Sequence, residues 1–170
     1  MEYFCDISYG GFMETIDDID RKILTILQEN ARTTNAEIAR QIGLAPSGTL
    51  ERIRKLEQRN VITGYHLGLN AGKLGFTVTA FMFVRSDDPV GDIKTARLLS
   101  EIPEVEEVHH IAGEDCYLVK LRCADNESLG RLMRESIGSI KTVRSSRTSV
   151  VLETIKEGGR IPIQQGHESI

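Results

Sequence analysis

The feature that most constrains this chain is a turn of only three residues, Gly43-Leu44-Ala45, between two segments with helical apolar spacing. Ile38 and Ile42 lie on one helix face before the turn. Pro46 follows the turn, and proline suits the first position of a helix because the N–H that it lacks has no helical partner there. A short turn with glycine between two short amphipathic helices is the geometry of a helix-turn-helix, which we therefore predict.

Local signals predict the limits of three helices around this turn. The first should run from Asp17 or Asp18 to about residue 30, with an acidic start that suits the positive end of the helix dipole. The second should begin at Thr34, three residues before Glu37, which is the spacing of a capping box. The third should extend from Pro46 to about residue 59.

The third predicted helix has one apolar stripe and one face that suits a DNA groove. Leu50, Ile53 and Leu56 recur at three-residue spacing, which indicates the buried stripe. The opposite face is small at its start and basic further on, so it can approach base edges and hold phosphates. Together with the start of the second helix, the predicted DNA contacts are Thr33, Thr34, Asn35, Ser47, Gly48, Thr49, Arg52, Arg54 and Lys55.

The distribution of charge favours DNA binding although the whole chain is acidic. The formal net charge is −4, whereas residues 31–60 contain six basic and three acidic side chains, a local balance of +3. A local basic patch is the electrostatic feature expected of a selective DNA-binding protein. The alternative is a three-helix bundle that contacts no DNA and serves as an interaction domain.

Residues 77–157 show a different pattern, in which strands alternate with two helices. Val78, Ala80, Met82 and Val84 alternate with Thr77, Thr79, Phe81 and Phe83, which predicts a strand that is buried on both faces or lies at an interface. The order βαββαβ predicts a ferredoxin-like antiparallel sheet with both helices on one face. A second copy would cover the open face, so we expect a homodimer. The later elements are expected at residues 90–102 (helix), 105–111 (strand), 116–123 (strand), 125–137 (helix) and 143–155 (strand).

The predicted fold class is therefore α+β. We expect a flexible N-terminal arm at residues 1–13, a winged helix-turn-helix (three-helix) domain at 14–64, a linker at 65–76, a ferredoxin-like domain at 77–157 and a C-terminal tail, flexible or loosely docked, at 158–170. The linker is assigned because four glycines recur between residues 64 and 75, and such a segment lets two domains reorient.

Several segments of the chain resemble the Lrp/AsnC family of bacterial and archaeal regulators, also called feast/famine regulatory proteins. They are residues 19–24, 35–39, 44–57 and 61–65, and the run 50–57 is the most characteristic. The resemblance extends from about residue 16 to 156. It implies a sequence-specific transcriptional regulator that binds double-stranded DNA and forms homodimers, which assemble to tetramers, octamers or higher forms. Two departures are Ala45, where relatives usually have Ser, and Cys116, where many have Asp.

The resemblance also implies a small effector, mostly an amino acid, in a pocket where dimers meet. The turn at residues 112–115 offers backbone N–H groups for a carboxylate and acidic side chains for an ammonium. Arg147-Thr148-Ser149, expected at the start of the last strand, resembles the segment that approaches this pocket. The predicted effector site is Ala112, Gly113, Glu114, Asp115, Arg147 and Thr148. The alternative is that Gly113 only permits a hairpin.

No other chemistry is indicated by the sequence. No Ser/His/Asp set, phosphate-binding loop or dinucleotide fingerprint is visible, so we expect no enzyme, no catalytic residue and no cofactor beyond the possible amino-acid effector. His109 and His110 point to opposite faces of a strand, and the three cysteines have no ligand spacing, so no metal site is expected. A signal peptide and a long apolar run are also missing, which favours a cytoplasmic, nucleoid-associated protein without a membrane partner.

Two other functions stay open at this level. Some proteins that resemble this family are enzymes that decarboxylate sirohaem, with the same two-domain layout. An oligomer that senses an effector without binding DNA is the second alternative.

Overall fold

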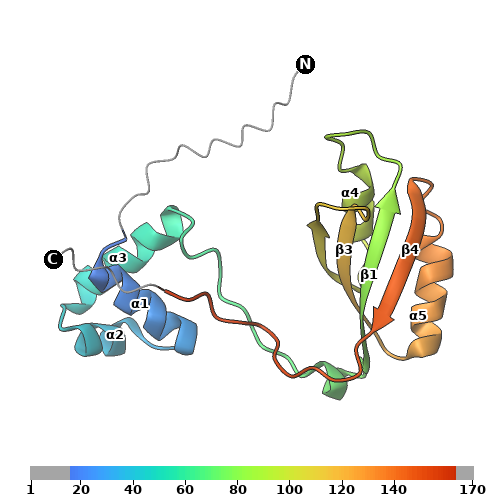
Figure 1. Ribbon diagram of the computed structural model, residues 1–170. Helices are drawn as coiled ribbons and strands as arrows, with labels where there is room; N and C mark the ends of the chain where they lie inside the picture. Colours follow the sequence, from blue (N-terminus) through green and yellow to red (C-terminus); the bar gives the residue numbers. More distant parts are fainter. Residues whose placement is uncertain (1–15, 164–170) are drawn as a thin grey trace. The chain divides into compact units, whose positions relative to one another are not determined.

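The computed structural model describes residues 16–163, which divide into two compact units (Figure 1). We call the unit of residues 16–67 and 158–163 the head, and the unit of Gly68–Glu157 the sheet unit. The predicted arm at residues 1–13 lies outside the described residues, as does the tail beyond residue 163. Among the described helices, none combines the length and apolar character that a bilayer crossing requires.

The head contains three helices with the limits that the local signals predict. They are α1 (Asp18–Glu29), α2 (Asn35–Ile42) and α3 (Pro46–Gln58). The Asp17 side chain accepts a hydrogen bond from the N–H of Asp20, and the Thr34 side chain accepts one from the N–H of Glu37. Both caps satisfy N–H groups that have no helical partner. Gly43 ends α2 in the left-handed conformation, with φ of 75°.

One apolar core holds the three helices together. Its buried residues come from all three, with Ile23 on α1, Ile38 on α2, and Ile53 and Leu56 on α3. The prediction of the apolar stripe on α3 is wrong at one position. Thr49 is fully buried, whereas the predicted Leu50 is only half-buried. Thr49, Ile53 and Leu56 are four and three residues apart, which follows the 3.6-residue turn better than constant spacing by three.

The wing expected after α3 does not form as a strand in residues 61–70. A single extended segment needs a neighbouring strand for its backbone hydrogen bonds, and these residues have none. The chain leaves α3 through Asn60, whose φ is 55°, and later forms the short 3-10 helix η1 (Ala71–Leu74).

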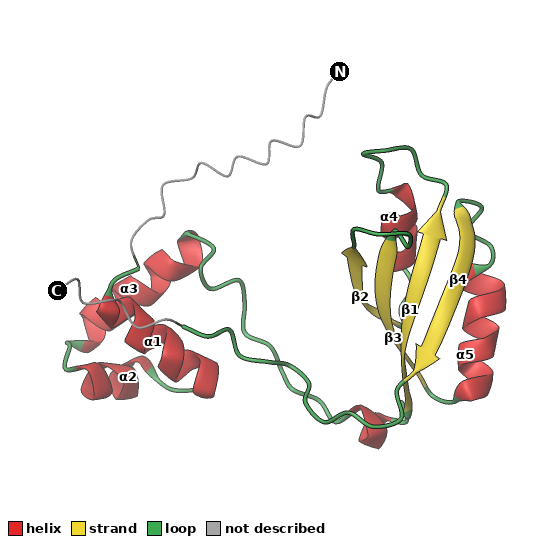
Figure 2. Ribbon diagram, viewed as in Figure 1, coloured by secondary structure: helices red, strands yellow, loops and turns green. Residues whose placement is uncertain are grey.

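The sheet unit confirms the ferredoxin-like prediction (Figure 2). Its four strands lie in the order β2-β3-β1-β4, and each neighbouring pair is antiparallel. The elements are β1 (Val78–Ser86), α4 (Lys94–Ser100), β2 (Val105–His110), β3 (Tyr117–Cys123), α5 (Asn126–Leu132), the π-helical turn η2 (Met133–Ile137) and β4 (Val143–Val150).

Both helices cover the same face of this sheet. Ala80, Met82 and Val84 of β1 are fully buried in a cluster that also contains Leu99 of α4 and Leu132 of α5. The opposite face of β1 is more open, and 37% of Phe81 is exposed. The prediction that this strand is buried on both faces is therefore wrong within one chain, because no helix reaches the second face. Its alternative, a face at an interface, stays a prediction.

Two elements are shorter than predicted. The helix expected at residues 90–102 begins at Lys94, since Gly91 adopts a φ of 89° and Asp88 Oδ2 accepts from the N–H of Thr95 in the first turn. The strand expected at residues 143–155 ends at Val150. Ladder pairing with β1 stops there, and the apolar side chain of Leu152 is almost wholly exposed.

Candidate nucleic-acid interface and effector site

The exposed face of α3 carries the small and basic residues that the sequence predicts for DNA contact. Ser47, Gly48, Arg54 and Lys55 are all exposed. Pro46 starts the helix, and the core contacts of Ile53 and Leu56 on the opposite side hold this face outward. Small residues at the first turn allow close approach, and the two cations can reach phosphates or guanine. This surface is the candidate DNA interface.

A carboxylate lies within the same surface. Glu51 is exposed, and its Oε1 is 3.0 Å from Nζ of Lys55 one turn later. The hydrogen bond from Lys55 and its charge lower the pKa of Glu51. A carboxylate on a groove-facing helix repels phosphates, but it can accept a hydrogen bond from a cytosine amino group.

The predicted contacts at the start of α2 serve mainly in local caps. The Thr34 side chain is the helix cap, and the Thr33 hydroxyl donates to the carbonyl oxygen of Asn30 over 2.8 Å. Thr33 and Asn35 are half-buried, whereas Thr34 is exposed. Further along α2, hydrogen bonds from Arg40 and Gln41 lower the pKa of Glu37 to about 2.

Thr49 is not part of this surface, which corrects the prediction. Its side chain is fully buried, and its hydroxyl donates to the carbonyl oxygen of Ala45 over 3.2 Å. Thr49 lies on the same side of α3 as Ile53 and Leu56, so the rotation of the helix turns it toward the core.

Arg52 is held by two carboxylates of the same unit instead of extending from α3. Its Nη1 is 2.7 Å from Oδ2 of Asp17 and 2.8 Å from Oδ1 of Asp20. The hydrogen bonds to Asp17 and Asp20 raise the pKa of Arg52, while the backbone N–H of Asp20 and the Arg52 pair lower the pKa of Asp17. The sequence indicates both acids only as helix-start residues, so this connection was missed.

The sheet unit brings together two of the segments predicted for an effector. Nη2 of Arg147 on β4 lies 3.4 Å from Oδ2 of Asp115, which precedes β3. The guanidinium carbon of Arg147 is also 4.5 Å from the centre of the Phe83 ring. Ala112, Gly113 and Glu114 are exposed, and the φ of 142° at Gly113 is a conformation that favours glycine.

Thr148 does not belong with Arg147, contrary to the prediction. Neighbouring residues of a strand point to opposite faces of the sheet. Thr148 is paired with Met82 on the helix-covered face, and its hydroxyl lies 3.4 Å from the sulfur of Met133. The segment also lies within β4 and not at its start, because the strand begins at Val143.

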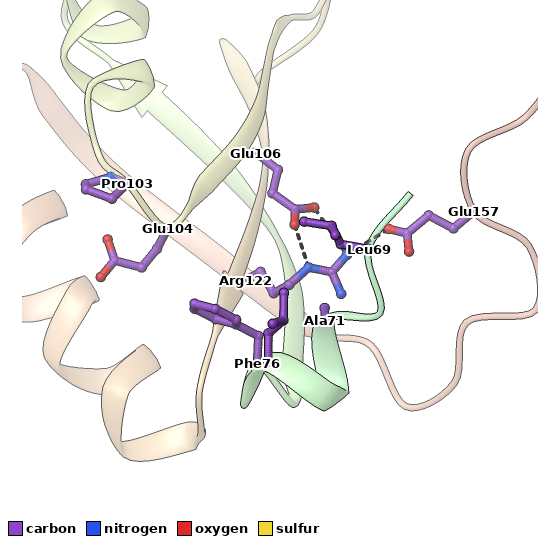
Figure 3. Close-up of a pocket in the computed structure, with 9 residues that line it drawn as sticks. Leu69, Ala71, Phe76, Pro103, Glu104, Glu106, Arg122 and Glu157 are labelled. Carbon is purple, nitrogen blue, oxygen red and sulfur yellow. Dashed lines mark hydrogen bonds and ion pairs between the residues drawn. The ribbon is translucent and has the colours of Figure 1, made fainter. Parts of the chain in front are cut away.

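A hollow of about 510 Å³ lies at another edge of the sheet unit (Figure 3). Its lining includes Leu69, Leu74 and Phe76, and Arg122 is the basic group within it. Arg122 forms ion pairs with Glu106 and Glu157. The hydrogen bond from Arg122 lowers the pKa of Glu106, whereas the pKa of Glu157 is lowered mainly by the hydrogen bond from Lys120 and then by the charges of Lys120 and Arg122. The sequence alone does not indicate this hollow, because its walls come from separate segments.

Both units of the chain match families of known proteins. Residues 16–57 match the family model described as the AsnC-type helix-turn-helix domain, and residues 79–161 match the Lrp/AsnC ligand binding domain. The leucine-responsive regulatory protein of Escherichia coli strain K12 is 32% identical over 151 residues, which cover 88% of this chain and 92% of that protein. The chain belongs to the Lrp/AsnC family. The resemblance stated from the sequence is thereby confirmed.

Solved structures of Lrp/AsnC proteins agree with this fold. A transcriptional regulator of Neisseria meningitidis in complex with L-methionine aligns with a TM-score of 0.81 at 29% identity, covering 87% of this chain and 97% of that one. E. coli AsnC aligns with a TM-score of 0.80 at 28% identity, over 87% of this chain and 99% of AsnC. A feast or famine regulatory protein of M. tuberculosis, complexed with L-methionine, has a TM-score of 0.80 at 31% identity, over 88% of this chain and all of that one.

Proposed function

We propose that this protein is a sequence-specific, DNA-binding transcriptional regulator whose binding responds to a small effector. The observation that carries the proposal is the exposed edge of α3, where Arg54 and Lys55 follow the small residues Ser47 and Gly48 on a three-helix head. A helix of this kind enters the major groove while the preceding helix crosses the backbone. The names of the relatives favour this function over the tetrapyrrole enzyme considered from the sequence.

Selection of bound duplexes from a random DNA pool tests the proposal. We expect a consensus of roughly palindromic form, because two heads of a symmetric dimer read two half-sites. Binding should weaken steeply with salt, since basic side chains displace counterions from phosphates. A selection that returns no consensus, with equal binding to all duplexes, would reject a sequence-specific regulator.

The proposed effector is an amino acid. Its carboxylate would face the Arg147 guanidinium and the backbone N–H groups around Gly113, and its ammonium would face Asp115. Arg147 and Asp115 support this arrangement, because they place opposite charges 3.4 Å apart beside an exposed turn. Calorimetric titration with each of the twenty amino acids tests it, and the selection is repeated with those that bind. Absence of heat with all twenty would exclude an amino-acid effector.

The proposed assembly is a homodimer formed through the open face of the sheet. Phe81 and Phe83 of β1 lie on the face opposite the helices, and Phe81 is partly exposed. Burying apolar area of this kind stabilises association. Sedimentation velocity should give a dimer or a multiple of it, including the tetramers and octamers expected from the family. In a cell, the proposed place of action is the cytoplasmic nucleoid.

A further inference from the structure

Arg52 connects α3 to the first turn of α1. One nitrogen, Nη1, lies 2.7 Å from Asp17 and 2.8 Å from Asp20, which are 35 and 32 residues earlier in the chain. The side chain of Asp20 is 9% exposed, whereas those of Arg52 and Asp17 are 34% and 48% exposed. The contact is therefore shielded from water at Asp20 and open to it at Asp17. We call the three side chains the α1–α3 clamp.

The clamp is anchored firmly on the α1 side. Oδ1 of Asp17 accepts a hydrogen bond of 2.8 Å from the N–H of Asp20, while Oδ2 of Asp17 pairs with Arg52. One carboxylate therefore both caps α1 and holds α3. Charge-assisted hydrogen bonds of this geometry are stronger than neutral ones and fix the orientation of both partners.

The charge of the clamp makes Arg52 a poor phosphate contact. Two carboxylates surround one guanidinium, which leaves a net charge of −1 at the flank of α3. Arg54 and the 63%-exposed side chain of Lys55 lie on the outer face of the same helix. Phosphates would be attracted to these outer cations and repelled by the clamp.

We propose that Arg52 is a positioning residue, held by Asp17 and Asp20, that sets the angle of α3 so that Arg54 and Lys55 reach DNA. The inference rests on the proposed DNA-binding function and goes beyond it by separating residues that touch DNA from residues that aim the helix.

The two possible roles of the clamp carboxylates predict opposite changes in affinity. If Asp17 and Asp20 only add negative charge near DNA, then Asp17→Asn and Asp20→Asn should tighten binding. If they position α3 through Arg52, the same substitutions should weaken it. Asn is as good a helix cap as Asp, so Asp17→Asn keeps the α1 cap. Asp18→Asn is the matched control, because the 77%-exposed Asp18 pairs with Arg21.

The experiment measures binding of the full chain to its selected duplex and to a scrambled duplex over a range of salt. We expect Asp17→Asn, Asp20→Asn and Arg52→Met to bind the selected duplex about tenfold more weakly, the scale of one lost charged hydrogen bond. In these variants, binding to the scrambled duplex should hardly change. The salt dependence of binding should hardly change either. Arg54→Ala should instead lower the slope of log K against log salt by about 0.9 for each phosphate contact removed. Arg52→Lys should recover part of the loss.

Thermal melting of each variant shows that it is folded at the temperature of the binding measurement. If Arg52→Met does not fold, Asp17→Asn carries the test. Tighter binding of the two Asn variants, or a reduced salt slope in Arg52→Met, would overturn the inference and make Arg52 a DNA contact. A wild-type chain that does not prefer its selected duplex would instead overturn the proposed function.

Discussion

The hydroxyl of Tyr117 donates a hydrogen bond to Oδ2 of Asp88 over 3.0 Å, and the same oxygen accepts from the N–H of Thr95, also over 3.0 Å. Tyr117 begins β3 and is 1% exposed, and Thr95 lies in the first turn of α4. One carboxylate therefore ties β3, the strand after the turn at residues 112–115, to the start of α4.

Removing this hydroxyl should destabilise the protein. Tyr117→Phe leaves Asp88 with one donor fewer in a partly buried position, and we expect the free energy of unfolding to fall by about 1–3 kcal/mol. Urea denaturation followed by circular dichroism measures the change. Tyr65→Phe is the control, because the half-exposed Tyr65 donates to Glu57 and its loss should cost less than about 0.5 kcal/mol. Equal losses in the two variants would contradict the buried role of Tyr117.

Asp88 should also make stability depend on pH. Burial opposes ionisation of Asp88, but hydrogen bonds from Thr95 and Tyr117 outweigh it and lower the pKa of this carboxyl group. Folding therefore favours the ionised form. Its contribution to the stability of the folded state is fully present above the unfolded pKa of about 3.9. This stabilisation is lost as the pH falls through the lower pKa that Asp88 has in the folded state. Titration by carboxyl-carbon NMR should give a midpoint below about 3.9 for Asp88, and a midpoint above that value would refute the shift.

A missing helix cap can be supplied at α3. Ala45 has the backbone of a cap residue, with φ of −71° and ψ of 144°, but makes no side-chain cap bond. Ala45→Ser should therefore raise the free energy of unfolding by about 1 kcal/mol. Thr34 has nearly the same backbone, with φ of −72° and ψ of 152°, and its side chain caps α2. Thr34→Ala should lower stability by a similar amount, and thermal melting of both variants checks the opposite signs.

Gly48 should lower the stability of α3 but allow this helix to approach DNA closely. A Cβ added there meets no atom within 4 Å, so Gly48→Ala should stabilise α3 by about 0.5–1 kcal/mol. The methyl group would lie on the exposed first turn, where it displaces the helix from the base edges. We expect higher melting temperature together with weaker binding to the selected duplex. A variant that gains both stability and affinity would show that this position does not face DNA.

Asp115 should be needed for the response to an amino acid. Asp115→Asn removes the negative charge proposed to face the ammonium group, so titration heat and the effector-dependent change in DNA affinity should both disappear. Asp87→Asn is the matched control, since Asp87 pairs with Arg144 in another exposed contact of the sheet unit. An undiminished response in Asp115→Asn would place the effector elsewhere.

The limits of the head helices were predictable because each depends on neighbours in the sequence. Asp17 and Thr34 cap the N–H groups three residues later, and Gly43 provides the left-handed residue that ends α2. The order of strands and helices followed in the same way from apolar alternation. These are local preferences, which the sequence carries directly.

The positions of single side chains in the sites were less predictable. The assignment of Thr49 to the outer face was wrong because a shift of one residue on a helix rotates the side chain by about 100°. Thr148 was placed with Arg147, but the pairing of β4 with β1 turns it toward the helices. Such outcomes depend on how an element is rotated against the core, which spacing alone defines poorly.

The sequence by itself determined the three-helix head and the βαββαβ order, because caps, turns and apolar periods act over a few residues. The family followed separately, from the resemblance of particular segments such as residues 50–57. Only the tertiary structure decided that Arg52 turns to Asp17 and Asp20 and that Arg147 meets Asp115. Those pairs join residues more than thirty positions apart. Their partners are chosen by the packing of whole elements, since a charged side chain pairs with whichever opposite charge the fold brings within reach.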